Sequence, residues 1–368
     1  MAIMRFAMLG GFLGAGKTTA LARLAAHYTS QGRKVGLVTN DQAQNLVDTL
    51  SLRAQGFDVA EVPGACFCCK FDELVEKVGS LEAHDRPDII LAEPVGSCTD
   101  LVATVIQPLK DLYRTRFSVA PYAVMFKPSH GLKILRNESC GFSPKAAYIF
   151  RKQLEEADAI VINRVDQIAP DDLTELQELI EAGYPGTPVL AVSAKTGQGF
   201  DALTALLDLD GAFGRKILDI DYDIYAEGEA ELGWLNSSVH VESSIPFDLD
   251  DLIRDVMKRL HRQLAKTDGE VAHLKVIGLE EGGAFAVANL VSSSDEPVLS
   301  LASGTLLTEA DLIVNARVAL DPDVLQQIAH DAVTKACEAR GIDPEFRQSQ
   351  SLRPGRPTPT HRYKAEKN

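Results

Sequence analysis

Three observations in the sequence predict an α/β protein with a doubly wound, mostly parallel sheet and a smaller C-terminal α+β domain. Short β-branched apolar runs alternate with helical segments through the first two-thirds of the 368 residues. Polar residues follow these runs, at the strand ends where parallel sheets bind ligands. A glycine-rich stretch separates the first run from the first helical segment. The predicted strands are 5–9, 34–40, 57–62, 88–92, 119–126, 159–162 and 188–192, the predicted helices include 18–26 and 143–156, and 127–141 is expected to be irregular.

The glycine-rich stretch fits the pattern G-x-x-x-x-G-K-[ST]. It reads Gly11-Phe12-Leu13-Gly14-Ala15-Gly16-Lys17-Thr18-Thr19. Between a strand and a helix, this pattern predicts the phosphate-binding P-loop of P-loop NTPases. Backbone N–H groups and the helix start surround a polyphosphate, Lys17 adds positive charge at the β- and γ-phosphates, and the Thr18 hydroxyl ligates Mg²⁺. The chain is therefore expected to bind a nucleoside triphosphate.

Two acids follow predicted strands on the nucleotide side. Asp41 is a candidate Mg²⁺ ligand, and the polar segment 42–52 after it is a candidate switch. Glu93 ends a buried run where P-loop proteins organise Mg²⁺ and the attacking water, and Gly96 lets the backbone approach the γ-phosphate. The candidate catalytic residues are thus Lys17, Asp41 and Glu93. For Asp41 a solvated loop carboxylate remains the alternative.

The strand at 159–162 leads into Asn163-Arg164-Val165-Asp166. An N-x-x-D element at a strand end is typical of guanine recognition, because the Asp166 carboxylate accepts from the ring N1–H and the 2-amino group, which adenine lacks. Asn163 is expected to support the loop and contact the base. The later Ser193-Ala194-Lys195 can place a backbone N–H at the guanine O6. In this order after a P-loop, the motifs favour GTP over ATP.

Three of the six cysteines lie within four positions, as Cys66, Cys68 and Cys69. Thiolates are soft ligands for Zn²⁺, Co²⁺ or Ni²⁺, and Glu61 is a candidate oxygen donor to the same ion. Three buried apolar cysteines, or a catalytic or redox thiol, are the alternatives. An iron–sulfur cluster normally needs four thiolates at wider spacing. Cys98 is a remote candidate to join the site.

The composition limits the partners. The 52 acidic residues outnumber the 37 basic ones, for a net charge of −15, which argues against nucleic acid and suits cationic partners or metal ions. No apolar run reaches transmembrane length, and residues 1–8 lead into the first strand rather than forming a signal peptide. Six cysteines are too few for a disulfide scaffold in a chain this long. A cytoplasmic protein with no membrane partner is expected.

The sequence divides into four predicted parts: a nucleotide-binding domain at 1–210, an acidic linker at 211–232, an α+β domain at 233–340 and a disordered basic tail at 341–368. In the α+β domain the predicted strands are 237–242, 271–277, 284–290 and 312–318, and the predicted helices are 248–264 and 322–339. Asp248 is expected to cap its helix.

With these motifs in hand, the chain resembles the CobW-like family of P-loop GTPases, which is related to the nickel-insertion GTPases of urease and hydrogenase maturation. The resemblance covers residues 5–210 well and 232–340 more weakly, and its most specific mark is C-x-C-C. The chain departs from the family pattern at Ala65 before the cysteines, at Asp41 where glutamate is usual, at Pro94 after Glu93, and at Arg164 where lysine is usual. These departures indicate a divergent branch.

The resemblance implies slow GTP hydrolysis with Glu93 at the hydrolysis site, and a transition-metal site at Cys66, Cys68 and Cys69. The expected function is that of a metallochaperone or metallocofactor-maturation factor, which delivers Zn²⁺ or Co²⁺, with Ni²⁺ as a further candidate, to a client metalloprotein. A nucleotide-dependent homodimer is a candidate assembly. The alternative is a GTP-dependent chaperone or activase for a cobalamin-dependent or other metalloenzyme that carries no free metal.

Overall fold

The computed structural model describes residues 3–41, 49, 52–53, 55–139, 141–281 and 283–365. The chain separates into two compact units. The first takes in the chain up to residue 140, Pro144–Ala226 and the segment from Arg356 onward, and the second takes in Gly141–Ser143 and Glu227–Gly355. The sequence-based division at 210 and 233 placed neither the short return at 141–143 nor the C-terminal return at Arg356.

The first unit is built on a parallel sheet. Its strands are β1 (Met4–Gly10), β2 (Val35–Asp41), β3 (Val59–Pro63), β4 (Ile89–Glu93), β5 (Phe117–Val119), β6 (Ala123–Phe126), β7 (Ala159–Ile162) and β8 (Val189–Ala191). Their order is β3-β2-β4-β1-β6-β7-β8, with β5 pairing beside β1, and every pairing is parallel. The chain moves from β1 toward one edge and then toward the other, so the loop after β1 lies where the winding direction changes.

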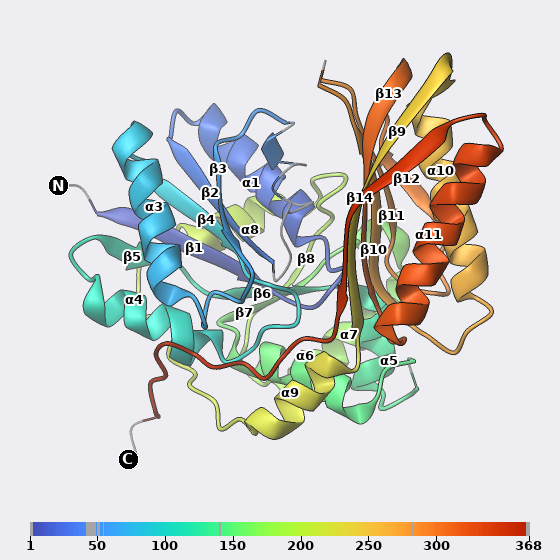
Figure 1. Cartoon of the computed structure of the whole chain (residues 1–368). Coiled ribbons are helices and arrows are strands. Elements are labelled where there is room, and N and C mark those ends of the chain that lie inside the picture. The colour runs from blue at the N-terminus through green and yellow to red at the C-terminus, as the bar shows by residue number, and fades with distance from the viewer. Residues whose placement is uncertain are drawn as a thin grey trace. The chain divides into compact units, whose positions relative to one another are not determined.

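Helices cover the faces of this sheet (Figure 1). The helices of this unit are α1 (Lys17–Ser30), α3 (Phe71–Asp85), α4 (Gln107–Leu112), α5 (Pro128–Leu135), α6 (Pro144–Glu156), α7 (Pro170–Gly183) and α8 (Phe200–Leu207), with the short π-helix η1 (Val102–Ile106) and the 3-10 helix η2 (Val165–Gln167). The helix α9 (Tyr222–Ala230) begins in the first unit and ends in the second. Leu21 and Leu24 of α1 share one buried cluster with Leu203 of α8 and with Leu37 and Leu91 of the sheet. This burial explains why most strand residues are apolar, and the parallel strand order confirms the predicted doubly wound fold.

The second unit is an antiparallel sheet with two helices. Its elements are β9 (Gly233–Asp248), α10 (Leu249–Leu264), β10 (Val271–Leu279), β11 (Phe285–Leu290), β12 (Val298–Leu301), β13 (Leu306–Val318), α11 (Pro322–Glu338) and β14 (Asp343–Leu352). The strand order is β12-β11-β10-β13-β9-β14. Figure 1 shows α10 and α11 on the same face of the sheet, and their apolar sides share one core with it. The predicted α+β character of this region is confirmed.

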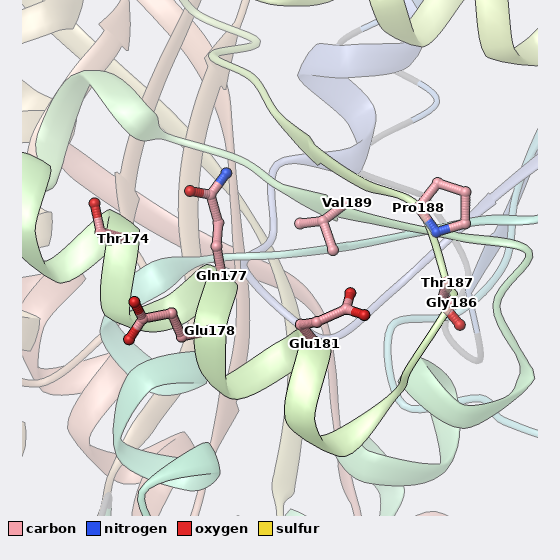
Figure 2. A pocket seen from close by; sticks show the side chains of 8 residues that line it. All are labelled: Thr174, Gln177, Glu178, Glu181, Gly186, Thr187, Pro188 and Val189. Carbon is pink, nitrogen blue, oxygen red and sulfur yellow. The ribbon is translucent and has the colours of Figure 1, made fainter.

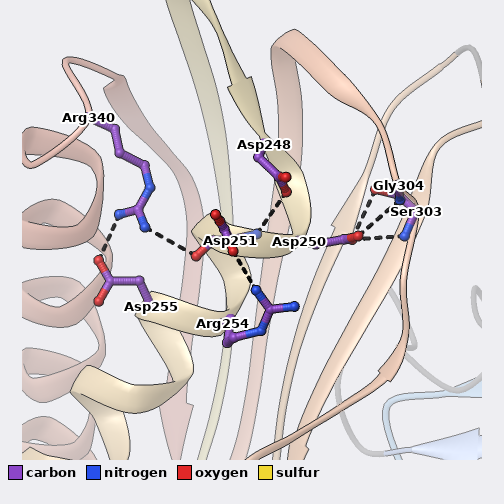
Figure 3. A network of polar contacts seen from close by, with 8 residues as sticks. All are labelled: Asp248, Asp250, Asp251, Arg254, Asp255, Ser303, Gly304 and Arg340. Atoms are coloured by element: carbon purple, nitrogen blue, oxygen red, sulfur yellow. Dashed lines mark hydrogen bonds and ion pairs between the residues drawn. The ribbon is translucent and has the colours of Figure 1, made fainter.

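Acidic side chains fasten the start of α10 (Figure 3). Asp248 accepts a hydrogen bond from the Asp251 N–H at 2.9 Å, as predicted for its cap. Asp250 accepts from the backbone N–H groups of Ser303 and Gly304 at 2.8 and 2.9 Å. These bonds tie α10 to the segment that precedes β13, and they lower the pKa of Asp250 despite its partial burial. The acids of α10 therefore serve this unit's own packing.

Three expectations about local structure were wrong. The supposedly irregular 127–141 contains α5, because Pro128 starts a helix whose apolar side includes Ile134 and Leu135. The linker contains α9, with Tyr225 buried. The tail expected to be disordered from Gly341 contains β14, which pairs with β9, and continues as an ordered segment to residue 365. Its polar composition concealed a strand at the edge of the sheet, where polar side chains face water.

Within the described ranges, no helix is both long enough and apolar enough to cross a membrane.

Candidate nucleotide and metal site

The P-loop connects β1 to α1 through residues whose backbone only glycine adopts easily. Gly11, Gly14 and Gly16 have φ angles of 126°, 71° and 88°. A Cβ on Gly16 would come within 2.5 Å of the Asn163 amide nitrogen, so the loop also needs glycine for space. The first turn of α1, with Thr18 and Thr19, points its free N–H groups at the loop. The loop therefore has the form of an anion cradle at a helix N-terminus.

Two side chains place charge and oxygen at this cradle. Lys17 is buried, and its ammonium group donates to the carbonyls of Gly11 and Phe12 at 2.9 and 3.4 Å. Thr18 Oγ1 donates to Glu93 Oε1 at 3.1 Å, which brings the end of β4 against the start of α1. Glu93 is buried as well. A hydroxyl paired with a carboxylate beside a phosphate cradle is the oxygen donor set that Mg²⁺ favours.

The segment that follows Glu93 packs against the P-loop. A Cβ on Gly96 would lie 2.8 Å from the Leu13 Cδ2 atom, so a larger residue would push the two loops apart. The Gln153 amide of α6 donates to the carbonyls of Gly96 and Cys98 at 3.0 and 2.8 Å. The buried Cys98 thiol is near enough to Cys66 to help lower the pKa of that thiol, after the larger effects of Cys68 and Cys69. One six-residue segment thus touches both the nucleotide loop and the cysteines.

Asn163 links the P-loop to the loop after β8. Its amide donates to the Ala15 carbonyl at 2.7 Å, and its oxygen accepts from the Ala194 N–H at 2.9 Å. The buried Ser193 and Ala194 are thereby held near the P-loop, whereas Lys195 is exposed. Arg23 of α1, which sequence reasoning missed, donates to the carbonyls of Ala194 and Lys195 at 2.8 and 2.9 Å. Its helical position between apolar residues carried no local signal of this role.

The N-x-x-D element turns sharply at the end of β7. Arg164 has a left-handed backbone with φ 62°, an uncommon conformation for a residue other than glycine. Asp166 follows in η2 with its side chain exposed. The exposed carboxylate is therefore accessible to a ligand, and its role in base recognition stays a prediction.

The three clustered cysteines gather their sulfur atoms on the turn between β3 and α3. The Sγ–Sγ distances are 2.8 Å for Cys66 to Cys68, 3.2 Å for Cys66 to Cys69 and 3.7 Å for Cys68 to Cys69. The N–H groups of Cys69 and Lys70 both donate to the Cys66 carbonyl at 3.0 Å, which forms the turn. In a tetrahedral zinc site with Zn–S bonds of 2.3 Å, sulfur atoms lie about 3.8 Å apart. The three thiols therefore need only a small expansion to hold one ion.

The cysteine turn is held by Asn40, at the end of β2. The Asn40 amide donates to the carbonyls of Val62 and Ala65 at 2.7 and 2.6 Å, and its oxygen accepts from the Phe67 N–H at 2.8 Å. Sequence reasoning treated Asn40 only as the polar end of a strand. The buried side chain fixes the turn on both sides of Cys66, one residue before the candidate Mg²⁺ ligand Asp41.

The thiols share negative charge unequally. Hydrogen bonds with Cys68 and Cys69 hold the pKa of Cys66 well below its usual range. The hydrogen bond to Cys66, together with burial, raises the pKa of Cys68, and the same bond raises the pKa of Cys69 to about 11. Of the three thiols, Cys66 is therefore expected to lose its proton first, and Cys68 and Cys69 keep theirs to higher pH.

Two predicted ligands stay predictions. Asp41 ends β2 in register with Pro63, but its side chain lies outside the described part of the chain. So do most of the candidate switch 42–52 and its Asp48, an acid that the sequence also offers for the Mg²⁺ or the attacking water. Glu61 is partly exposed on β3. Among the described residues, the group that could hold a metal ion consists of Cys66, Cys68 and Cys69 without it.

An open hollow of about 520 Å³ lies elsewhere on the first unit (Figure 2). It is lined by Thr174, Gln177, Glu178 and Glu181 of α7 and by Gly186, Thr187, Pro188 and Val189 at the start of β8. It shares no residue with the P-loop or the cysteine turn, and we assign no role to it.

A parallel sheet with a P-loop after its central strand and a carboxylate at the end of the neighbouring strand defines a P-loop nucleotide-binding protein. Residues 5–191, about half of the chain, match the family described as CobW/HypB/UreG, nucleotide-binding domain. The chain belongs to this family, and the resemblance drawn from its motifs is confirmed.

Relatives of known name agree with this placement. The zinc chaperone YeiR of Escherichia coli is 32% identical over 178 residues, which cover 46% of this chain and 49% of YeiR. The zinc chaperone CobW of Sinorhizobium is 28% identical over 211 residues, 52% of this chain and 59% of that protein. The chain thus spans half to three-fifths of the length of these relatives. Among solved structures, the hydrogenase maturation factor HypB of Archaeoglobus fulgidus is 17% identical and covers 55% of this chain and 88% of its own, with a TM-score of 0.39 that supports no further argument.

Proposed function

We propose that the protein is a GTP-hydrolysing metallochaperone that binds a transition-metal ion at Cys66, Cys68 and Cys69 and delivers it to a client metalloprotein. The observation that carries the proposal is the three-thiol cluster, whose sulfur atoms lie 2.8 to 3.7 Å apart in the unit that also carries the P-loop. Structural zinc sites normally close with four protein ligands, whereas three ligands leave a position open. An open position suits an ion that must be passed on.

On the nucleotide side, Lys17 contacts the β- and γ-phosphates and Thr18 ligates Mg²⁺ in the proposed function. The Thr18–Glu93 pair at 3.1 Å supports this assignment. Bound Mg²⁺ neutralises charge on the phosphates. Glu93 stands at the hydrolysis site, and Asp41 remains a proposed second Mg²⁺ ligand. No arginine finger is assignable from the sequence, so we expect slow intrinsic hydrolysis.

Guanine recognition is assigned to Asp166, with Asn163 and Arg164 shaping the loop and the 193–195 backbone completing the base pocket. Replacement Asp166→Asn removes the charged acceptor for the N1–H and 2-amino groups. We expect the ratio of GTP affinity to ATP affinity to fall at least about tenfold. Titration with labelled GTP and ATP measures it, and an unchanged ratio would mean that another group reads the base.

Zinc is the metal that the relatives' names favour, since YeiR and CobW are both zinc chaperones. The thiol donors also suit Co²⁺ and Ni²⁺, because soft ligands discriminate weakly among these ions. We therefore propose zinc as the cargo, with cobalt and nickel as competitors in the same assay.

Metal and nucleotide can influence each other through two short connections. Asn40 holds the cysteine turn and directly precedes Asp41. The 93–98 segment runs from the carboxylate that meets Thr18 to the thiol that meets Cys66. A nucleotide-dependent shift of either connection alters the geometry of the thiols, which is the basis for releasing metal to a client.

Metal analysis of the anaerobically purified chain tests the proposal. We expect one transition-metal ion per chain and loss of that ion in the triple variant Cys66→Ser, Cys68→Ser, Cys69→Ser. The matched control is Cys337→Ser, which removes another buried thiol from α11 in the second unit. Retention of the ion in the triple variant would overturn the metal site, and retention of GTP binding in the same variant would show that it folds.

A further inference from the structure

The C-terminal segment lies on the cysteine turn. The chain returns to the first unit at Arg356, and the Thr358 N–H donates to the Cys69 sulfur at 3.2 Å. The Thr360 N–H donates to the Cys68 carbonyl at 2.8 Å, and its hydroxyl donates to the Cys69 carbonyl at 3.1 Å. The segment therefore contacts the backbone of two candidate metal ligands and the sulfur atom of one.

Side chains beyond Thr360 anchor the segment to the helices next to the turn. The His361 ring meets the edge of Phe71, the first residue of α3, with ring centres 5.1 Å apart. The Tyr363 N–H donates to the Ala103 carbonyl at 3.0 Å, and its hydroxyl donates to Asp111. Figure 1 shows this part of the chain, in dark red, beside α4 of the same unit.

The strongest anchor is Arg362 on Asp100. The Arg362 Nε atom donates to Asp100 Oδ2 at 2.6 Å, and the Tyr222 hydroxyl donates to the same oxygen at 2.8 Å. The Asp100 side chain is fully buried, and its backbone is left-handed with φ 65°. A buried carboxylate needs such charged and hydrogen-bonding partners, so the ion pair ties the segment to the interior of the unit.

The segment also lies where access to the thiols is greatest. Cys66 and Cys68 are 3% and 2% exposed, whereas Cys69 is partly exposed. An ion or reagent that approaches from solvent therefore reaches Cys69 first. The Thr358 backbone stands at that sulfur, and hydrogen bonds from backbone N–H groups are the usual support of metal-bound thiolates.

We propose that residues 356–363 form a strap that covers the cysteine turn and sets the rate at which reagents and metal ions reach and leave Cys69. The metal part rests on the proposed function, whereas the cover over the thiols does not. Because the strap is part of the same chain, its local concentration at the turn is high, and it recloses after each opening. Release of Arg362 from Asp100 opens it.

The first experiment uses the metal-free, reduced full-length chain and needs no metal binding. N-methylmaleimide and a polyethylene-glycol maleimide react with the same thiolate, so the ratio of their rates at Cys69 reports steric access independently of the thiol pKa. We expect the bulky-to-small ratio, followed by mass spectrometry, to rise about tenfold in Arg362→Gln and in Asp100→Asn. The control Lys364→Gln removes a charge from an exposed neighbour and should leave the ratio unchanged.

The second experiment follows zinc removal from the loaded chain by a chromogenic chelator. We expect removal to be about tenfold faster in Arg362→Gln than in the parent or in Lys364→Gln. The double variant Asp100→Asn, Arg362→Gln replaces the ion pair by neutral groups and should open the strap as much as either single variant, not additively more. A chain ending at Gly355 provides a further measurement if a single variant folds poorly.

The outcomes separate the two proposals. Unchanged maleimide ratios in Arg362→Gln, Asp100→Asn and the truncated chain would overturn the strap, whatever the metal results. A raised ratio in a chain that binds no zinc would support the strap and overturn the proposed cargo. Faster zinc removal with an unchanged ratio would also count against the strap, because the metal would then escape by another route.

Discussion

The P-loop and the cysteine turn both follow a strand of the same sheet, yet they are stabilised in opposite ways. In the P-loop, Lys17 is held by carbonyls only five and six residues away. In the cysteine turn, Phe67 is held by Asn40 from 27 residues away, and Cys69 accepts a hydrogen bond from Thr358, 289 residues away. The P-loop adds to these local contacts the longer-range bonds of Asn163 to Ala15 and of Thr18 to Glu93, whereas the cysteine turn also takes contacts from the C-terminal segment.

This difference has a functional consequence. A phosphate loop whose lysine is held by its own carbonyls keeps part of its shape without other segments. A site assembled from several segments responds to whatever moves any of them. We therefore expect the metal affinity and metal exchange rate of the cysteine turn, more than the nucleotide affinity of the P-loop, to respond to movements elsewhere in the chain.

The largest effect is expected at the local scaffold. Lys17→Ala removes the charge from the β- and γ-phosphates, and the loss of two charge-assisted hydrogen bonds should weaken GTP binding about 100-fold or more. Zinc stoichiometry should stay at that of the parent, because the Lys17 ammonium group bonds the P-loop carbonyls of Gly11 and Phe12 and supplies no thiol. Fluorescent-nucleotide titration and metal analysis check both, and normal GTP affinity would refute the P-loop assignment.

The pH dependence should differ just as sharply between the two regions. With the pKa of Cys66 lowered and those of Cys68 and Cys69 raised, an ion that takes three thiolates displaces two protons near neutral pH. Zinc affinity should therefore rise about 100-fold per pH unit between about pH 7 and 8.5, and weaken as the pH falls.

Competition titrations at several pH values measure that slope, and buffer-dependent calorimetry counts the protons released. A slope near zero would mean that the thiols are already ionised or are not the ligands. GTP affinity, which involves none of these thiols, provides the comparison over the same range.

Asn40→Ala tests the dependence of the metal site on β2. It leaves the Val62 and Ala65 carbonyls and the Phe67 N–H without their hydrogen-bond partner. If this costs about 2 kcal/mol of zinc-binding free energy, zinc affinity falls about thirtyfold. Asn289→Ala in β11 of the second unit is the control for loss of an asparagine. Parent-like zinc affinity in Asn40→Ala would show that the turn keeps its shape without the clamp.

The smallest expected effect is the coupling between the sites. Replacing GDP by a non-hydrolysable GTP analogue should change zinc affinity about tenfold, which corresponds to about 1.4 kcal/mol, and zinc should change the affinity for the analogue by the same factor. Zinc competition titrations in the two nucleotide states measure it. Equal affinities would remove the nucleotide switch and leave two independent sites.

Much of the first unit was predictable because each of its sequence motifs lies within one short stretch of neighbouring residues. The apolar runs that became β1, β4 and β7 and the nine-residue P-loop lie within short stretches, where glycine conformation and strand periodicity act directly. The same is true of the α10 cap at Asp248. The predicted strand 119–126 overlaps β5 only at Val119 and contains β6, because β5 and β6 pair with β1 on either side of a break that apolar composition does not mark.

By itself the sequence determined that this chain has a glycine-rich loop before a helix, an N-x-x-D turn after a strand and three thiols on one loop, because each is written in neighbouring residues. Only the tertiary structure decided that Asn40 holds the thiol turn, that Gln153 and Arg23 fasten the adjoining loops, and that residues 356–363 lie over Cys69. These contacts join residues far apart in the chain through single hydrogen bonds. Such bonds impose no periodicity or spacing on the sequence, so folding alone brings the partners together.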